Sequence, residues 1–202
     1  MKLYYSPAAC SLSPHIAARE AGLPIELVRV DLKTHQTADG TDFHTINPKG
    51  YVPFLTLDDG TTLSEGPAIV QYLADRAPAS GLAPAAGTPE RYRLQEWLNY
   101  LSTEIHKGMG SLFDGRMPDE YKAVIRERVG KRFDFLTRAL DGKPYLMGDR
   151  FTVADGYLYT LLGWTQWLGI DLAHWPVLAQ YAARVGARPK VAEALKAEGL
   201  VK

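Results

Sequence analysis

The chain has 202 residues, of which 46% are apolar and 23% are charged, as is usual for a globular protein with a substantial core. This length allows one large domain or two small ones. Lys plus Arg and Asp plus Glu both number 23, which excludes a net charge that would attract nucleic acid or an anionic membrane. A single cysteine, Cys10, excludes an internal disulfide, and no signal peptide or membrane span is visible. We therefore expect a cytoplasmic protein.

The first 77 residues combine short strands with helices. Strands are recognised by alternating apolar and polar side chains, and helix ends by glycine and proline. Between the second strand and the third, a polar segment contains at most one short helical turn, near residues 41–45. We expect strands at 3–5, 25–30, 54–57 and 61–63, and helices at 11–21 and 67–76. This order predicts a mixed four-stranded sheet with helices packed on its faces.

Proline and glycine recur through residues 78–88, which we interpret as a linker. Everything beyond the linker has a helical pattern, and Thr152 with Asp155 predicts a capping box. The helix that this box opens is apolar nearly all round, so we expect it to be central and buried. We expect helices at 89–113, 119–140, 152–168, 176–185 and 190–197. The predicted organisation is an α/β domain at 1–77, the linker, and an all-helical domain at 89–202.

The most informative segment joins Val52-Pro53 to Glu65-Gly66-Pro67. A proline at the first residue of a strand leaves the backbone groups of the preceding residue, Val52, turned outward for a ligand. Gly66 and Pro67 are typical of a helix N-cap and first helical position, where amide groups and the helix dipole favour a carboxylate. Glu65 stands beside them and could pair with an ammonium group. This arrangement favours a zwitterionic, peptide-like ligand, whereas the simpler interpretation is a hairpin that leads into a helix.

Cys10 follows the first strand and directly precedes the first helix. A helix N-terminus lowers the pKa of a thiol because its dipole and amide groups stabilise the thiolate. Ser13 occupies the place of the second thiol of a Cys-x-x-Cys pair, so a dithiol redox motif is only half present. The simpler alternative for a lone cysteine is inert packing.

Taken together, these features resemble a cytosolic glutathione transferase, and most closely the bacterial beta class, which carries a cysteine at the Cys10 position. The resemblance covers the whole chain and implies a thioredoxin-like first domain followed by an all-helical one. The motifs that carry it are Val52-Pro53, Ser64-Glu65-Gly66-Pro67-Ala68-Ile69, Asn99 with Thr103-Glu104-Ile105-His106-Lys107, and Gly148-Asp149-Arg150-Phe151-Thr152-Val153-Ala154-Asp155.

The resemblance implies that glutathione binds as a co-substrate. Glu65 would pair with its ammonium group while the Gly66 amide takes the neighbouring carboxylate. Val52 would exchange backbone hydrogen bonds with the cysteinyl residue, as a strand adds to an edge, and a cis bond at Pro53 would orient it. His35 stands where the class usually has a lysine for the glycine carboxylate, and a histidine is only partly charged at neutral pH. Lys33 or Lys107 are alternatives for that contact.

In the second domain, the resemblance assigns Asn99 and residues 103–106 to the glutathione site. Helical spacing predicts that Asn99, Thr103 and His106 share one face. His106 is either a donor near the glutathione sulfur or a buried structural histidine, and Tyr5 is a further candidate donor. The resemblance also implies a homodimer in which the Glu104 region of the partner subunit completes each site. The residues Met109, Phe113, Met117, Tyr157 and Trp164 either pack the bundle or line an apolar pocket.

The expected reaction is conjugation of the glutathione thiolate to small apolar electrophiles, in detoxification or in the metabolism of aromatic or halogenated compounds. Cys10 would orient the bound thiolate, with His106 and Tyr5 as donors, and no metal is expected. One alternative is a glutathione-dependent thiol-disulfide reductase or reductive dehalogenase that uses Cys10 covalently. Another is a carrier of apolar ligands without catalysis, since fold alone does not fix function.

Overall fold

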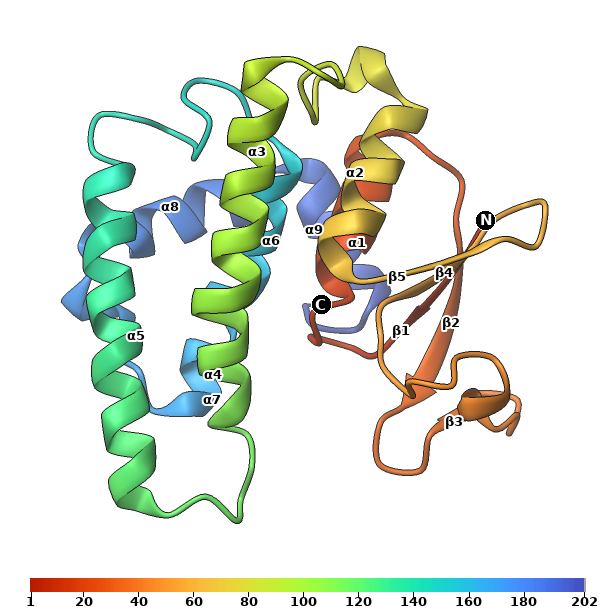
Figure 1. Ribbon diagram of the computed structural model, residues 1–202, viewed down its shortest axis with the longest axis horizontal. Helices are drawn as coiled ribbons and strands as arrows, with labels where there is room; N and C mark the ends of the chain where they lie inside the picture. Colours follow the sequence, from red (N-terminus) through yellow and green to blue (C-terminus); the bar gives the residue numbers. More distant parts are fainter. Residues whose placement is uncertain (202) are drawn as a thin grey trace. The chain divides into compact units, whose positions relative to one another are not determined.

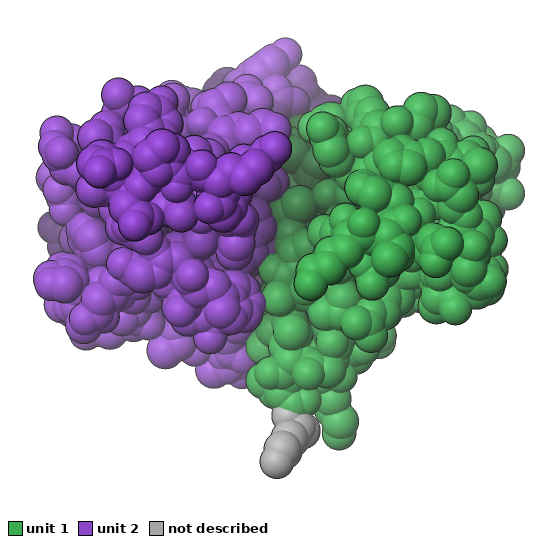
Figure 2. Space-filling model, turned by 90° about the horizontal axis from the view of Figure 1, so that it is seen from below, with its two compact units in different colours: residues 1–83, 188–202 green, residues 84–187 purple. Residues whose placement is uncertain are grey.

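The computed structural model describes residues 1–201 (Figure 1). The chain forms two compact units, coloured separately in Figure 2. The first contains Met1–Ala83 and the C-terminal segment from Arg188 onward, and the second contains Pro84–Ala187. The predicted domain boundary lies at the linker, whereas the compact units are defined by which residues pack together. The last helix, α9 (Pro189–Ala197), packs on α1 (Leu12–Glu20) and so joins the first unit.

The first unit contains a mixed sheet of five strands in the order β3-β2-β1-β4-β5. Its strands are β1 (Lys2–Tyr5), β2 (Glu26–Asp31), β3 (Gln36–Thr37), β4 (Phe54–Thr56) and β5 (Thr62–Ser64). β1 pairs with β2 in parallel, and the remaining pairs are antiparallel. The prediction of four strands was wrong because β3 is only two residues long. Such a short polar strand has no alternating pattern to reveal it.

The two faces of this sheet bury different residues. Leu3 pairs with Leu55, and both are fully buried. In Figure 1, α1 and α2 (Gly66–Arg76) lie on one face of the sheet. Tyr4 pairs with Phe54 on the opposite face, where both pack on Phe43 of the short helix η1 (Phe43–Thr45). The predicted helical turn near 41–45 is therefore confirmed. A second short helix, η2 (Pro78–Ser80), follows α2 directly and lies within the predicted linker.

In the second unit, the regular elements between Pro84 and Ala187 are all helices. Its helices are α3 (Pro89–Tyr100), η3 (Leu101–His106), α4 (Lys107–Ser111), α5 (Asp119–Ala139), α6 (Val153–Gly163), α7 (Thr165–Leu168), η4 (Leu172–His174) and α8 (Pro176–Gly186). No helix within residues 1–201 is long and apolar enough to cross a membrane.

Two of the predicted long helices are interrupted. The helix expected at 89–113 contains a π-helical stretch, η3, in which the Lys107 amide donates to the Ser102 carbonyl five residues earlier. The helix expected at 152–168 ends at Gly163, and the Thr165 hydroxyl donates to the Leu162 carbonyl at 2.7 Å as a new short helix begins. Local side-chain and backbone hydrogen bonds of this kind compete with a continuous helix.

The predicted capping box at the start of α6 is confirmed and extends into the core. Asp155, fully buried, accepts from the Thr152 amide at 2.8 Å, and the Thr152 side chain completes the box. Asp155 also accepts from the Leu146 amide and the Tyr181 hydroxyl, both at 2.8 Å. Burial raises the pKa of Asp155, and these hydrogen bonds oppose that rise. One carboxylate thus joins the loop before α6, the helix itself and α8.

We expect Asp155→Ala to lower the free energy of unfolding by at least about 3 kcal/mol. It removes a helix cap and leaves buried donors of Leu146, Thr152 and Tyr181 without an acceptor. Urea unfolding followed by circular dichroism measures the change. The exposed Asp149 offers a control, since Asp149→Ala is expected to change the stability by no more than about 0.5 kcal/mol. Equal stabilities of the two variants would contradict this role of Asp155.

Candidate functional site

The predicted site residues fall into two groups, one in each compact unit. In the first unit, Cys10 lies in the loop between β1 and α1, and its thiol donates to the Val52 carbonyl at 3.2 Å. The structure therefore brings together two predicted residues that lie far apart in the sequence. In this arrangement Cys10 acts as a donor, which differs from the role of a thiolate nucleophile.

Val52 and Pro53 form the centre of this group. Their peptide bond is cis, as the resemblance implied. Val52 precedes β4 and so lies outside the ladders that β4 forms with β1 and β5. Gly66 is adjacent, because a Cβ atom built on it would lie 3.9 Å from Cγ of Pro53. The segment before β4 and the start of α2 therefore lie side by side.

Glu65 occupies the N-cap position of α2, one residue earlier than predicted, and Gly66 is the first helical residue. Glu65 has a φ angle of 69°, in the left-handed region. Non-glycine residues rarely adopt this region, and it is frequent at functional sites. The Glu65 carboxylate accepts from the ammonium group of Lys49 at 2.9 Å, and Lys49 also donates to the Ser64 hydroxyl at 3.0 Å. Both side chains of the ion pair are more than half exposed, so the pair contributes little to stability.

The sequence interpretation missed Lys49, and also the residue that positions its loop. The buried Asn47 side chain donates to the Tyr51 carbonyl at 2.8 Å and accepts from the Lys49 amide at 3.2 Å. One amide side chain thus fixes the loop that ends at Val52. Its only sequence signal was an asparagine before a proline in a polar segment, which is common in ordinary turns.

His35 lies in the loop after β2, with a φ angle of 53°. Its ring lies against that of His44, with centroids 4.5 Å apart, and its buried Nδ1 has no hydrogen-bond partner among residues 1–201. Both rings approach Gly50, where a Cβ atom would lie 2.5 Å from Cε1 of His44 and 3.2 Å from Nδ1 of His35. Only glycine fits at that position, which also has a positive φ of 66°.

Tyr5 ends β1 and is nearly buried. Burial raises the pKa of its phenol, and the negative charge of Glu198 adds to the effect. The raised pKa favours the protonated phenol, which suits a hydrogen-bond donor.

In the second unit, η3 presents its residues in several directions. The His106 Nδ1 atom lies 2.6 Å from the Tyr157 hydroxyl of α6, and its ring meets Trp164 edge to face at 4.9 Å. Trp164 in turn contacts Phe113, whose ring is half exposed. Histidine and aromatic rings from three segments thus form one cluster within this unit.

The other predicted residues of η3 do not face this cluster. Thr103 and Glu104 line a pocket of about 360 Å³ together with residues of α5. Ile105 is fully buried, and the exposed Asn99 accepts at its carbonyl from the Thr103 hydroxyl at 3.0 Å. The prediction that Thr103 and His106 share a face was wrong. In a π-helix the bonded residues are five apart, so positions three apart diverge further than in an α-helix.

Family models described as "Glutathione S-transferase, N-terminal domain" and "Glutathione S-transferase, C-terminal domain" match residues 8–76 and 103–198. The curated glutathione S-transferase GstA of Escherichia coli O157:H7 is 45% identical over 200 residues, which cover 99% of this chain and 100% of the relative. The chain belongs to the glutathione S-transferase family.

Solved structures refine the position of this glutathione transferase within the family. A sphingomonad glutathione S-transferase complexed with glutathione is 51% identical and has a TM-score of 0.96 over the full length of both chains. A bacterial beta-class enzyme from Sphingomonas chungbukensis is 48% identical, also with a TM-score of 0.96 and full coverage of both chains. The resemblance to bacterial beta-class transferases and the thioredoxin-like and helical fold are therefore confirmed.

Proposed function

We propose that this glutathione transferase binds glutathione at Cys10, Val52, Pro53, Glu65 and Gly66 and joins its sulfur to the electrophilic carbon of small apolar compounds. The observation that carries the proposal is the surface formed by Val52, the cis Pro53 and the start of α2. It places the backbone groups of Val52, the Gly66 amide and the Glu65 carboxylate side by side. These are the partners that the middle and the γ-glutamyl end of the tripeptide require.

The contact between Lys49 and Glu65 supports the assignment of the ammonium site. An ammonium group of the chain itself lies 2.9 Å from the Glu65 carboxylate, beside the Ser64 hydroxyl. The ligand ammonium would replace Lys49 there or share the carboxylate with it, since a carboxylate has two acceptor oxygens. The ligand carboxylate would then take the Gly66 amide, where the helix dipole favours a negative charge. Pro67 has no amide hydrogen, and the Ala68 amide already donates to the Glu65 carbonyl at 3.0 Å.

The contact between Cys10 and Val52 favours an orienting role for the thiol. The Val52 carbonyl is the group that would accept from the cysteinyl amide of glutathione, and Cys10 already donates to it at 3.2 Å. A carbonyl oxygen has two lone pairs, so both donors could be accepted together. Cys10 would then lie beside the cysteinyl residue of the ligand and help to orient its thiolate, which performs the nucleophilic attack.

His106 and Tyr5 are proposed as donors to that thiolate. The raised pKa of Tyr5 favours its protonated phenol, and the second ring nitrogen of His106 has a defined orientation because Nδ1 contacts Tyr157. We assign the apolar electrophile to the aromatic cluster of Phe113, Tyr157 and Trp164. His35 stays the proposed contact for the glycine carboxylate. A cytoplasmic location also stays a prediction.

We also propose a homodimer in which Thr103 and Glu104 of the partner subunit complete each site. In the second unit, His106 faces α6 whereas Thr103 and Glu104 face α5, so one bound ligand would not reach both from the same helix. Tyr92, Tyr121 and Phe135 on α3 and α5 are between 43% and 63% exposed. Large exposed apolar side chains on neighbouring helices are typical of an interface.

Glu65→Ala is expected to weaken glutathione binding roughly ten- to a hundredfold, because a hydrogen bond to a charged group is lost. Isothermal titration calorimetry measures the affinity, and conjugation of an aryl halide tests the activity. Lys49→Met is the matched control. It removes the competing ammonium and should leave the affinity within about threefold of the unaltered protein, or slightly tighter. Unchanged affinity in a folded Glu65→Ala protein would remove the assignment.

Cys10→Ala is expected to reduce kcat/KM for aryl halide conjugation by less than about tenfold, because the site loses one hydrogen bond. Cys10→Ser, which keeps a donor toward Val52, should lie closer to the unaltered enzyme. If the covalent alternative were correct, both variants would lose glutathione-dependent disulfide reduction altogether while the unaltered enzyme shows it.

Sedimentation velocity should show a dimer. Phe135→Asp places a charge in the exposed apolar surface of α5 and is expected to give monomers that have lost most of their conjugation activity. Trp167→Asp, at an equally exposed aromatic residue of α7, should remain dimeric. A fully active monomer of the unaltered protein would disprove the proposed assembly.

A further inference from the structure

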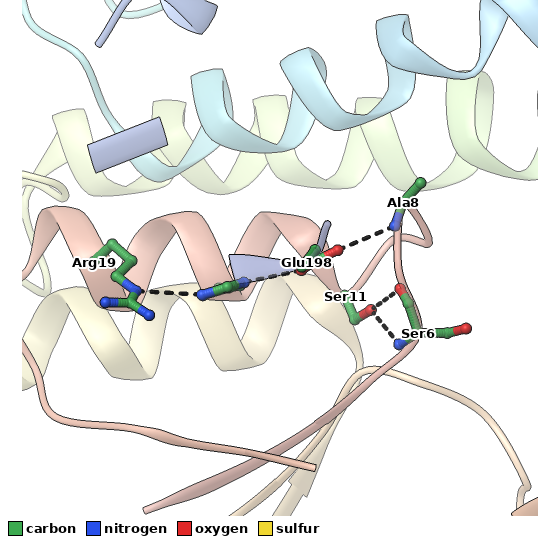
Figure 3. Close-up of polar contacts among 6 residues, drawn as sticks. Ser6, Ala8, Ser11, Arg19 and Glu198 are labelled. Atoms are coloured by element: carbon green, nitrogen blue, oxygen red, sulfur yellow. Dashed lines mark hydrogen bonds and ion pairs between the residues drawn. The ribbon is translucent and has the colours of Figure 1, made fainter. Parts of the chain in front are cut away.

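A buried hydrogen-bond network joins the C-terminal segment to the loop that carries Cys10 (Figure 3). His15 of α1 and Glu198, which follows α9, are both fully buried at their side chains, and Nδ1 of His15 lies 2.9 Å from Oε1 of Glu198. Both belong to the first unit. Buried charged groups are rare unless they are paired, so this pair needs an explanation.

The hydrogen bonds assign the protons. Arg19, which is always charged, donates from Nε to Nε2 of His15 at 3.3 Å, so Nε2 is an acceptor. With Nε2 as the acceptor, Nδ1 is the ring nitrogen that donates to Oε1 of Glu198. The second oxygen of Glu198, Oε2, accepts from the backbone amide of Ala8 at 3.0 Å. The Tyr5 ring also lies near His15, with ring centroids 6.3 Å apart.

The Ala8 amide, which donates to Glu198, belongs to a strained part of the loop. Ala8 has a φ angle of 61°, in the left-handed region that alanine rarely adopts. Such a conformation persists only where the surroundings fix it, and Glu198 holds the amide of this residue. On its other side, the loop is closed by the Ser11 hydroxyl, which accepts from the Ser6 amide at 3.1 Å and donates to the Ser6 carbonyl at 3.2 Å. Cys10 lies between these two fixed points.

We propose that the His15–Glu198 pair is a positioning device for Cys10. Arg19 fixes the tautomer of His15, His15 orients Glu198, and Glu198 holds Ala8, which sets where the Cys10 thiol meets the Val52 carbonyl. The C-terminal segment thereby controls how reactive and how accessible this thiol is. The consequence for glutathione binding rests on the proposed function, whereas the consequence for the thiol does not.

The test uses the full-length protein without glutathione, because Cys10 is its single cysteine and alkylation by iodoacetamide reports on it alone. Glu198→Gln keeps the shape of the side chain but has one acceptor oxygen in place of two, so it cannot hold both Ala8 and His15. We expect Cys10 to be alkylated about tenfold faster, because the loop releases the thiol from Val52. In steady-state conjugation, KM for glutathione should rise by about tenfold while kcat changes by less than about threefold.

Two further variants separate positioning from simple stabilisation. His15→Ala removes the donor to Glu198 and should also speed alkylation, whereas His15→Asn supplies an N–H group near the place of Nδ1 and should restore a slow rate. Glu20→Gln breaks the ion pair of Glu20 with Arg188, 2.7 Å between Oε1 and Nε, which also joins α1 to the C-terminal segment. Glu20→Gln should leave the alkylation rate unchanged even where thermal unfolding shows an equal loss of stability.

An unchanged alkylation rate in Glu198→Gln, or an equal acceleration in Glu20→Gln, would overturn the proposal. If Glu198→Gln does not fold, the comparison of His15→Ala with His15→Asn decides it, and equal rates in those two variants would count against it. Faster alkylation in a protein that does not bind glutathione would support the positioning device and refute only the proposed function.

Discussion

The pairing of Phe54 with Ser64 is the constraint on which the glutathione-binding surface depends. Because these residues face each other across β4 and β5, the residues just outside the pair, Pro53 and Glu65, are also neighbours. The cis bond and the start of α2 therefore meet at one end of the hairpin. A shift of this register by one residue would move every side chain of the hairpin to the other face and separate the two halves of the surface.

In the structure, groups of the chain itself occupy the polar positions that we assign to the ligand. Lys49 lies at the Glu65 carboxylate, and the Cys10 thiol lies at the Val52 carbonyl. Both contacts are weak, since one is an exposed ion pair and the other a thiol hydrogen bond. The surface thus keeps its polar groups satisfied, and a ligand can join or replace these contacts at small cost. This property fits a substrate that has to bind and leave in every turnover.

The rigidity of the surface comes from residues that would not touch the ligand. Asn47 fixes the loop before Val52 from one side, and the His15–Glu198 pair fixes the loop of Cys10 from the other. In the second unit, Asp155 has the corresponding structural role, since its carboxylate joins α6 to α8 and to the loop before them. Each is a buried polar side chain with its hydrogen bonds satisfied, which specifies one conformation more sharply than apolar packing does.

The sequence by itself determined the class of the fold, the family, and most elements, because periodicity, caps and the Val52-Pro53 and Glu65-Gly66 motifs are local signals. It could not show β3, whose two residues carry no period, or the π-helix that turns Thr103 and His106 apart. Nor could it show that Lys49 meets Glu65 or that Glu198 reaches Ala8 across 190 positions. Those contacts depend on strand register and on the packing of α9 against α1, and such long-range pairings leave no pattern in the neighbouring residues. Only the tertiary structure decided them.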